Sequence, residues 1–346
     1  MGLVVLKVVS KDSAPNISFF TRAYVGLLSE DKLVDFVVSN QSNREKAVYA
    51  ISRLSGHGLV KAVNLTDSRD VLRVGLKQLV SEGDVGSVVS IACSTSKPGK
   101  GKLCCEQLLS SSYFAALEKV FENACTEEVR LAALQGFDFV LEEDLQYAVD
   151  SGRFDSVRAI MEHASSIGVR EKARRILQRP SVEHFQIAAS SQPSEGLDVL
   201  AFYCKDPEMC EMILGEYSQP DPFYGSSHAE LVGLATSTKS EVMAGIIFDY
   251  FVQKASEYEE EGLADSFLEY AANSVASFEG QSFDREELQL RALDSFFKKK
   301  RFGLMQSVAD SSDSGKVREE CSRLLNRWRE ENSRSVLVPE QGEVVS

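Results

Sequence analysis

The segment Ser96-Lys97-Pro98-Gly99-Lys100-Gly101-Lys102 contains the residue types of a phosphate-binding loop. Such a loop cradles phosphates with backbone N–H groups and needs the spacing Gly-x-x-x-x-Gly-Lys-Ser/Thr after a buried strand. This segment lacks that spacing, and Leu103 stands where a magnesium-binding hydroxyl is required. We therefore predict a flexible basic linker between helices here, and no nucleotide site.

Two acidic clusters, Glu142-Glu143-Asp144 and Glu259-Glu260-Glu261, offer carboxylates for acid–base chemistry. Neighbouring residues on a helix point to different sides, and no histidine accompanies either cluster, so a paired-carboxylate mechanism is not supported. The sequence also lacks the Gly-x-Ser-x-Gly, His-Glu-x-x-His and catalytic-cysteine signatures. We predict a non-enzyme without a cofactor, in which Glu142, Glu143 and Asp144 are solvated or contribute to a partner interface.

The cysteines and histidines do not form a ligand set for a metal. The seven cysteines are an odd number without a Cys-x-x-Cys pair, and the four histidines are not spaced as ligands. Scattered cysteines of this kind are typical of reduced thiols in the cytoplasm or nucleus. We predict no metal site.

The charge balance disfavours nucleic acids and anionic membranes as partners. The formal net charge is −14, and such a surface repels polyphosphates while it attracts basic proteins. Lys298-Lys299-Lys300-Arg301 resembles a nuclear-import signal, but cations at a helix C-terminus are also stabilised by the helix dipole, and we prefer that structural interpretation. No apolar run reaches the roughly 18 residues of a membrane-spanning helix, and the valine-rich start lacks the basic region of a secretory signal.

A repeated nine-residue pattern indicates the elements that carry these residues. Val-Arg-x-x-(Ala/Cys)-x-x-x-(Leu/Phe) occurs at Val129, Val169 and Val317, and the first two copies start 40 residues apart. A weaker relative begins at Arg44. A period near 40 is typical of helical solenoids, whose units bury their apolar faces only by stacking on neighbours. We expect Val169, Ala173, Ile176 and Leu177 of the second copy to be buried between repeats.

Almost every segment has the apolar spacing of a helix, and we predict an all-α protein. The only exception is a possible strand over Leu3 to Val9. The turn Gly56-His57-Gly58 is interpreted as a helix C-terminus, where glycine takes the left-handed conformation. The predicted helices are 18–28, 31–39, 44–54, 68–80, 85–93, 103–124 with a break at 110–112, 129–141 with Thr126 as N-cap, 154–164, 169–177, 182–189, 196–203, 207–217, 229–234, 241–255, 263–276, 286–297, 303–309 and one from 314.

The domain organisation that follows is one α-solenoid of HEAT- or armadillo-like repeats over residues 1–332, with a short irregular start over 1–17. A chain of 346 residues accommodates roughly eight units of about 40 residues. Residues 333–346 mix Pro, Gly, Glu and Ser without periodicity, and we predict a disordered tail. Solenoids of this type commonly present binding surfaces.

Several segments resemble the family of 26S proteasome non-ATPase regulatory subunit 5. The resemblance is carried by Asp221-Pro222-Phe223-Tyr224, by Leu231 to Leu234, by Glu261 to Phe283 with its ending Phe278-Glu279-Gly280-Gln281, and by Lys102 to Glu128. These are short shared stretches, and the chain is shorter than the animal members. Members of that family are acidic cytosolic helical-repeat chaperones that hold ATPase subunits of the proteasome base by their C-terminal small domains during assembly.

The resemblance implies a protein partner, the C-terminal domains of the proteasome base ATPases, and a cytoplasmic or also nuclear location. Asp221, Phe223 and Tyr224 are candidate contacts, because a proline-rich loop with exposed aromatic residues is a common anchor, but we prefer the interpretation that they pack a connection between repeats. The alternative is a HEAT or armadillo scaffold or adaptor for another complex, including a phosphatase scaffold. An import receptor is disfavoured, since Trp328 is the only tryptophan and arrays of Trp-x-x-x-Asn are absent.

Overall fold

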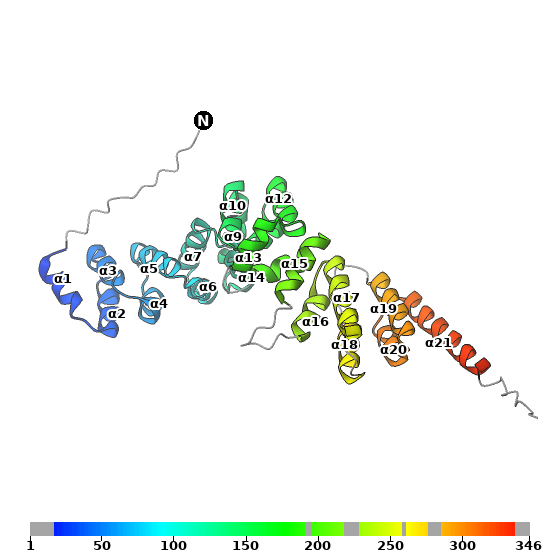
Figure 1. The fold of residues 1–346 in the computed structure, drawn as a ribbon. Coiled ribbons are helices and arrows are strands. Elements are labelled where there is room, and N and C mark those ends of the chain that lie inside the picture. The colour runs from blue at the N-terminus through cyan, green and yellow to red at the C-terminus, as the bar shows by residue number, and fades with distance from the viewer. Residues whose placement is uncertain (1–16, 191–194, 218–227, 258–260, 276–284, 336–346) are drawn as a thin grey trace, which may run out of the picture. The chain divides into compact units, whose positions relative to one another are not determined.

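The computed structural model describes residues 17–190, 195–217, 228–257, 261–275 and 285–335, and every regular element in these ranges is a helix (Figure 1). The all-α prediction is confirmed. None of the described helices is both long and apolar enough to cross a membrane. The possible strand at Leu3 to Val9, the candidate contacts Asp221, Phe223 and Tyr224, and residues 336–346 of the predicted tail lie outside the described residues.

The chain divides into two compact units, Met1–Ala173 and Arg174–Ser346. The boundary falls inside helix α12, and the prediction of a single domain over 1–332 stays a prediction. The helices that begin in the first unit are α1 (Phe19–Gly26), α2 (Glu30–Ser39), α3 (Arg44–Ile51), α4 (Gly56–Leu65), α5 (Arg69–Ser81), α6 (Val85–Ser94), α7 (Pro98–Ser110), α8 (Phe114–Asn123), α9 (Glu127–Gly136), the 3-10 helix η1 (Phe137–Phe139), α10 (Glu142–Asp150), α11 (Phe154–His163) and α12 (Ile167–Gln178).

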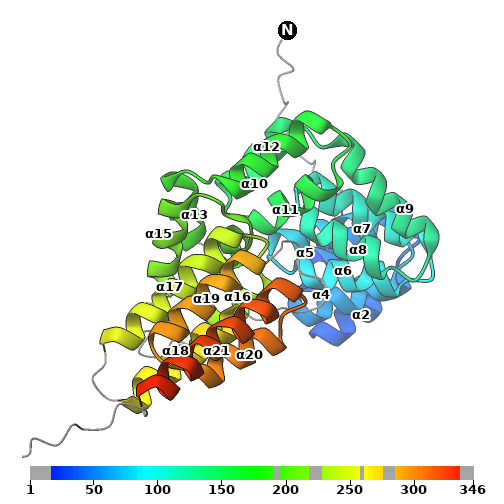
Figure 2. The same cartoon turned by 90° about the vertical axis from the view of Figure 1, so that its right-hand side faces the viewer.

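The second unit contains nine further helices among its described residues. They are α13 (Val182–Ser190), α14 (Glu195–Tyr203), α15 (Pro207–Tyr217), α16 (His228–Ser237), α17 (Glu241–Glu257), α18 (Glu261–Ser274), α19 (Glu286–Lys298), α20 (Phe302–Asp310) and α21 (Gly315–Ser335). Figure 2 shows the helices of this unit lying side by side.

Each helix packs mainly on the helices one and two places along the chain. In the first unit α3, α5, α7 and α9 pack in one row, while α6, α8 and α11 pack in a second, and consecutive helices join the rows. In the second unit α13, α15 and α17 form one row and α14, α16, α18 and α20 the other. The core of each unit therefore lies between two helical layers, where the apolar face of each helix is covered by its neighbours.

Ion pairs between segments two helices apart recur at one spacing. Four charge-assisted hydrogen bonds join residues that are 30 positions apart, with a lysine Nζ as donor each time. The pairs are Asp31–Lys61, Asp67–Lys97, Glu142–Lys172 and Glu286–Lys316, at 2.5 to 3.0 Å. The offset between acid and lysine is the same in all four pairs, but the residues occupy different positions in their elements, and each exposed pair adds little stability.

The nine-residue pattern marks the buried face of its helices. Val129, Ala133 and Val317 have no exposed surface, and Val169 and Ala173 are also buried. Leu177 is buried too, whereas Ile176 is only partly buried, so the predicted orientation of these helices is confirmed except at Ile176. The packing at Val129 is tight, because a Cβ atom on Gly101 of α7 would lie 2.3 Å from Val129 Cγ2. Gly101 is thus needed where α7 crosses α9.

The prediction of a helix end at Gly56-His57-Gly58 is wrong, because α4 begins there. Gly56 does take a left-handed conformation (φ +49°), but at the start of a helix. The Gly58 N–H donates to Glu30 Oε1 at 2.9 Å, and a Cβ on Gly58 would collide with that carboxylate. The glycine permits an acid from α2 to reach the positive N-terminus of α4.

Four further predictions need correction. The basic linker over 96–102 is largely helical, because Pro98 occupies the first position of α7, where its fixed φ favours a helix. Helix α10 was not predicted, since only Leu145, Ala148 and Val149 form its short apolar face. Helix α21 extends to Ser335, into the predicted tail, as no proline or glycine follows before Pro339. Thr126 is the N-cap of α9, but its hydroxyl does not cap the helix.

Candidate functional site

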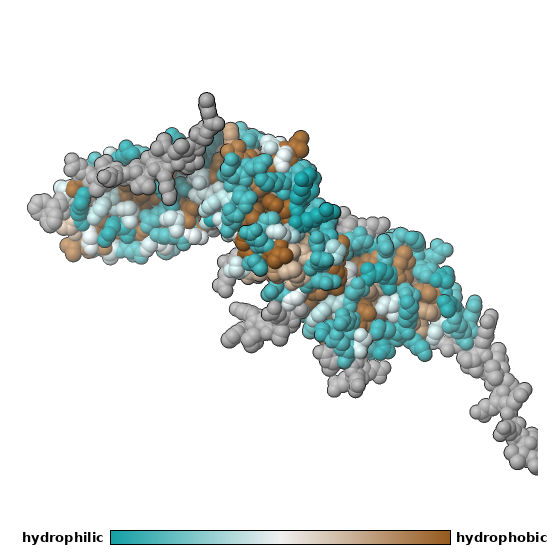
Figure 3. Space-filling model, turned by 45° about the horizontal axis from the view of Figure 1, so that its top comes forward, coloured by the Kyte–Doolittle hydropathy of each residue, from teal (hydrophilic) through white to brown (hydrophobic). Residues whose placement is uncertain are grey.

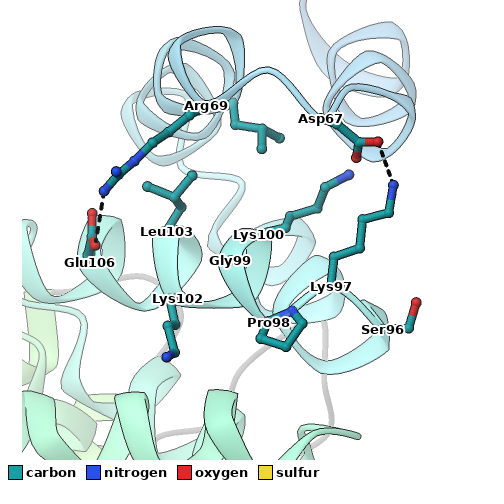
Figure 4. A pocket seen from close by; sticks show the side chains of 11 residues that line it. Asp67, Arg69, Ser96, Lys97, Pro98, Gly99, Lys100, Lys102, Leu103 and Glu106 are labelled. Atoms are coloured by element: carbon teal, nitrogen blue, oxygen red, sulfur yellow. Dashed lines mark hydrogen bonds and ion pairs between the residues drawn. The ribbon is translucent and has the colours of Figure 1, made fainter.

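A surface groove lies between the start of α5 and the first turns of α7 (Figure 4). Its volume is about 630 Å³, within the range of small-molecule and peptide pockets. Leu72, Pro98 and Leu103 supply its apolar lining. The charged residues of this basic groove are Asp67, Arg69, Lys97, Lys100, Lys102 and Glu106.

The cations of the basic groove are held mainly by groups of the same chain. Lys97 Nζ lies 2.5 Å from Asp67 Oδ2, and this hydrogen bond lowers the pKa of Asp67. Arg69 lies 4.0 Å from the carboxylate of Glu106. Figure 4 shows Lys102 extending away from both acids, and it forms no ion pair with a described residue. The pairs in the groove are exposed, so each is worth little on its own.

Lys100 is the buried member of this group, with 7% of its surface exposed. Its ammonium donates to the carbonyl oxygens of Val63 (3.1 Å) and Asn64 (2.8 Å) at the end of α4. Burial lowers the pKa of Lys100 because the charged form loses water. A cation at the negative C-terminus of a helix is a structural cap. One of the lysines that resembled part of a phosphate-binding loop therefore binds backbone carbonyl groups of the same chain.

A second cluster of titratable groups joins α8 to α11. Arg158 bonds both oxygens of buried Glu118 and lies 3.0 Å from Glu162, while His163 Nε2 is 2.9 Å from Glu118 Oε1. Burial raises the pKa of Glu118, but the bonds and charge of Arg158, together with His163, outweigh it and hold that pKa below its usual value. Glu118, Glu162 and His163 are close enough to share a cation. The Arg158 guanidinium already contacts both carboxylates and offsets one of their two charges, so the cluster fits a structural ion-pair network.

The three predicted contacts at the start of α10 have different roles. Glu142 pairs with Lys172 Nζ at 2.7 Å. Asp144 accepts a hydrogen bond from the Leu141 backbone N–H at 3.0 Å, which closes the first turn of the helix. Glu143 is exposed and forms no hydrogen bond or ion pair with a described residue. The three acids thus share a turn, but only Glu143 is wholly available to a partner.

Four exposed apolar side chains that the sequence pattern did not indicate precede these acids in the chain. Leu131, Leu134, Phe139 and Leu141 are 49%, 38%, 71% and 60% exposed. Leu131 and Leu134 are three residues apart on α9 and so share one side of that helix. Together with the exposed acids Glu127, Glu128, Glu142 and Glu143 they form what we call the acidic apolar face. Figure 3 shows that apolar side chains reach the surface among hydrophilic ones on this protein.

A signal for this face was present in the repeated pattern. Leu131 and Leu134 correspond to Glu171 and Arg174 when the copies at Val129 and Val169 are aligned. The outward positions are therefore apolar in one copy and charged in the other. No family model and no curated protein matches the sequence.

Proposed function

We propose that the chain is a non-enzymatic, protein-binding α-solenoid of HEAT- or armadillo-like repeats. The observation that carries this proposal is the recurrence of lysine–carboxylate pairs 30 residues apart in a two-layered stack of helices. Stacks of this kind present extended surfaces assembled from successive repeats, and they function mainly by binding other proteins. Apart from Lys102, the charged groups of the basic groove and of the Glu118 cluster are engaged in structural contacts, which favours a binding role over catalysis.

We further propose that the partner is an ATPase subunit of the proteasome base, which the chain holds by its C-terminal domain during assembly in the cytoplasm. The support is the resemblance over Lys102 to Glu128, Asp221 to Tyr224 and Glu261 to Phe283. The net charge of −14 suits a locally basic partner domain, since opposite charges accelerate encounter. Binding requires no nucleotide on this chain.

The test is to mix the purified full chain with the isolated C-terminal domain of each of the six base ATPases and to measure complex formation by calorimetry. We expect one or two domains to bind selectively, with weaker association as salt rises, because the Debye length falls to about 10 Å near 0.1 M. Failure of all six domains, with selective capture of an unrelated protein from lysate, would remove the proteasome assignment. The protein-binding proposal would then rest on the captured partner.

A further inference from the structure

We propose that the acidic apolar face of α9, η1 and α10 binds a basic amphipathic helix of a partner protein. This inference rests on the proposed binding function and assigns to it a contact surface and a partner chemistry. It is carried by three observations on described residues: apolar exposure, uncompensated charge, and the geometry of α9.

The apolar exposure is concentrated in a short stretch. Leu131, Leu134, Phe139 and Leu141 lie within eleven residues, and all four are among the exposed large hydrophobic side chains of the described chain. Ile167 is also exposed, and the Ser165 N–H to Phe137 carbonyl bond of 3.3 Å brings its segment to η1. Single exposed hydrophobic residues are ordinary, but a gathering of them with a polar rim marks interaction sites.

The charge of the same stretch is one-sided. Residues 127–143 contain five acids (Glu127, Glu128, Asp138, Glu142 and Glu143) and a single cation, Arg130, a net charge of −4. Lys172 neutralises only Glu142. The side chains of Glu127, Glu128 and Glu143 form no hydrogen bond or ion pair with a described residue. A partner must therefore supply cations around an apolar centre.

The negative charge also excludes other kinds of partner that an exposed apolar surface could bind. A second copy of this chain would bring the same acids against themselves, and like charges across an interface are strongly unfavourable. An anionic lipid surface or a nucleic acid would be repelled for the same reason. A segment with Lys or Arg beside its apolar side chains is not repelled by the acids of the face.

The length of the face suits a helix. Leu131 lies on α9 and Phe139 lies eight residues further on, at the end of η1, so with about 1.5 Å per residue in α9 and about 2 Å in η1 the stretch is about 14 Å long where the two run on in line. Apolar residues at positions i, i+3, i+4 and i+7 of an amphipathic partner span about 10 Å, so a stripe of this kind that continues for one more turn covers the face. Lysines on the flanks of that stripe would supply the cations for Glu127 and Glu128 of α9 and for Glu143 of α10.

The probe for the first test is a synthetic 18-residue amphipathic helix with leucine at the stripe positions and lysine on both flanks. The control peptide has the same sequence with glutamate in place of every lysine. Fluorescence anisotropy with the full chain should show binding of the lysine peptide alone. Equal binding of both peptides would overturn the proposal, because the charge of the face would then be irrelevant.

The second test removes the acids. The triple variant Glu127→Lys, Glu128→Lys and Glu143→Lys should weaken binding of the lysine peptide by roughly tenfold or more at low salt. A control variant carries the same change in net charge at exposed acids elsewhere, and its affinity should stay within roughly twofold of the parent. The control substitutions are Glu45→Lys, Glu208→Lys and Glu211→Lys. An equal loss in both variants would show that only the overall charge attracts the peptide, and the proposal would fail.

The third test removes the apolar centre. The double variant Leu131→Ser, Phe139→Ser should bind the lysine peptide roughly tenfold more weakly, which is the usual scale for loss of an interface anchor. Leu27→Ser with Val182→Ser changes equally exposed apolar residues outside the face and should leave affinity unchanged. Circular dichroism and thermal melting of all variants should match the parent, since the substituted side chains are solvent-exposed.

The partner assignment and this inference fail separately. If an ATPase C-terminal domain binds the parent and the triple lysine variant equally well, the contact lies elsewhere, and the inference is overturned while the proposed function stands. If no ATPase domain binds but the lysine peptide depends on the face as described, the inference stands and the proteasome assignment falls.

Discussion

The basic groove includes residues of α7, and the acidic apolar face includes residues of α9, which packs against α7 in the same unit. The charged groups of the groove are mostly paired within the described part of the chain, whereas most acids of the face are not. In the groove, Lys97 is paired with Asp67 and Lys100 with two carbonyl oxygens. On the face, Glu127 and Glu128 have no such partner among the residues that the structure describes. Charged residues clustered in the sequence therefore indicate a binding site only where the fold leaves them uncompensated.

The sharpest contrast can be made within α9 itself. Ala133→Asp would place a carboxylate at a position with no exposed surface and should destabilise the unit by about 3–5 kcal/mol, the range for an unpaired buried charge. Leu131→Asp, two residues away on the exposed side, should stay within about 0.5 kcal/mol. Urea unfolding measures both. Equal stabilities would mean that the two sides of α9 are assigned wrongly.

The contact between the two regions is tested at Gly101. Gly101→Ala would place a methyl 2.3 Å from Val129 Cγ2, and the overpacking should cost about 1–3 kcal/mol despite the better helix propensity of alanine. Gly99→Ala is the matched control, because no atom lies within 4 Å of its Cβ position. The midpoint of thermal unfolding should fall for Gly101→Ala only. A fall for both would point to helix initiation rather than to packing.

The structural role of the groove is tested at Lys100. Lys100→Met removes the donor to the Val63 and Asn64 carbonyls and should destabilise the protein by about 1 kcal/mol, since loss of a desolvated ammonium offsets part of the lost hydrogen bonds. Lys102→Met, at an exposed cation of the same groove, should leave the stability almost unchanged. Neither change should alter binding of the lysine peptide. A strong effect of Lys102→Met on stability would contradict this assignment.

The smallest expected effect is a pH dependence at the groove. The pKa of Asp67 is lowered by its hydrogen bond from Lys97, so the contribution of Asp67 to stability is present above its unfolded pKa of 3.8 and is lost as pH falls through the lowered value. Asp67→Asn should therefore reduce stability slightly at neutral pH and by less at pH 2. Melting curves of both proteins at the two pH values measure the difference, and an equal deficit at pH 2 would assign it to packing instead.

The acids of α10 show the limit of sequence reasoning at the candidate site. Glu142, Glu143 and Asp144 are consecutive and chemically alike, but they differ in their contacts. Lys172 pairs with Glu142, and the Leu141 N–H donates a hydrogen bond to Asp144. The identity of Lys172 as a partner depends on the stacking of helices thirty residues apart, which no local pattern specifies. Three of the six predicted contacts, at 221, 223 and 224, lie outside the described residues.

The sequence by itself determined that the described chain is helical and which side of the patterned helices is buried, because a 3.6-residue periodicity is local and is set by neighbours along the chain. Only the tertiary structure decided that Gly56 begins a helix, that Gly101 makes room for Val129, and which charges are paired. These depend on atoms distant in sequence: the carboxylate of Glu30 meets Gly58 across 28 residues, and the ammonium of Lys100 meets Val63 across 37. Charge and exposure are properties of packed neighbours, and packing is fixed only when the helices come together.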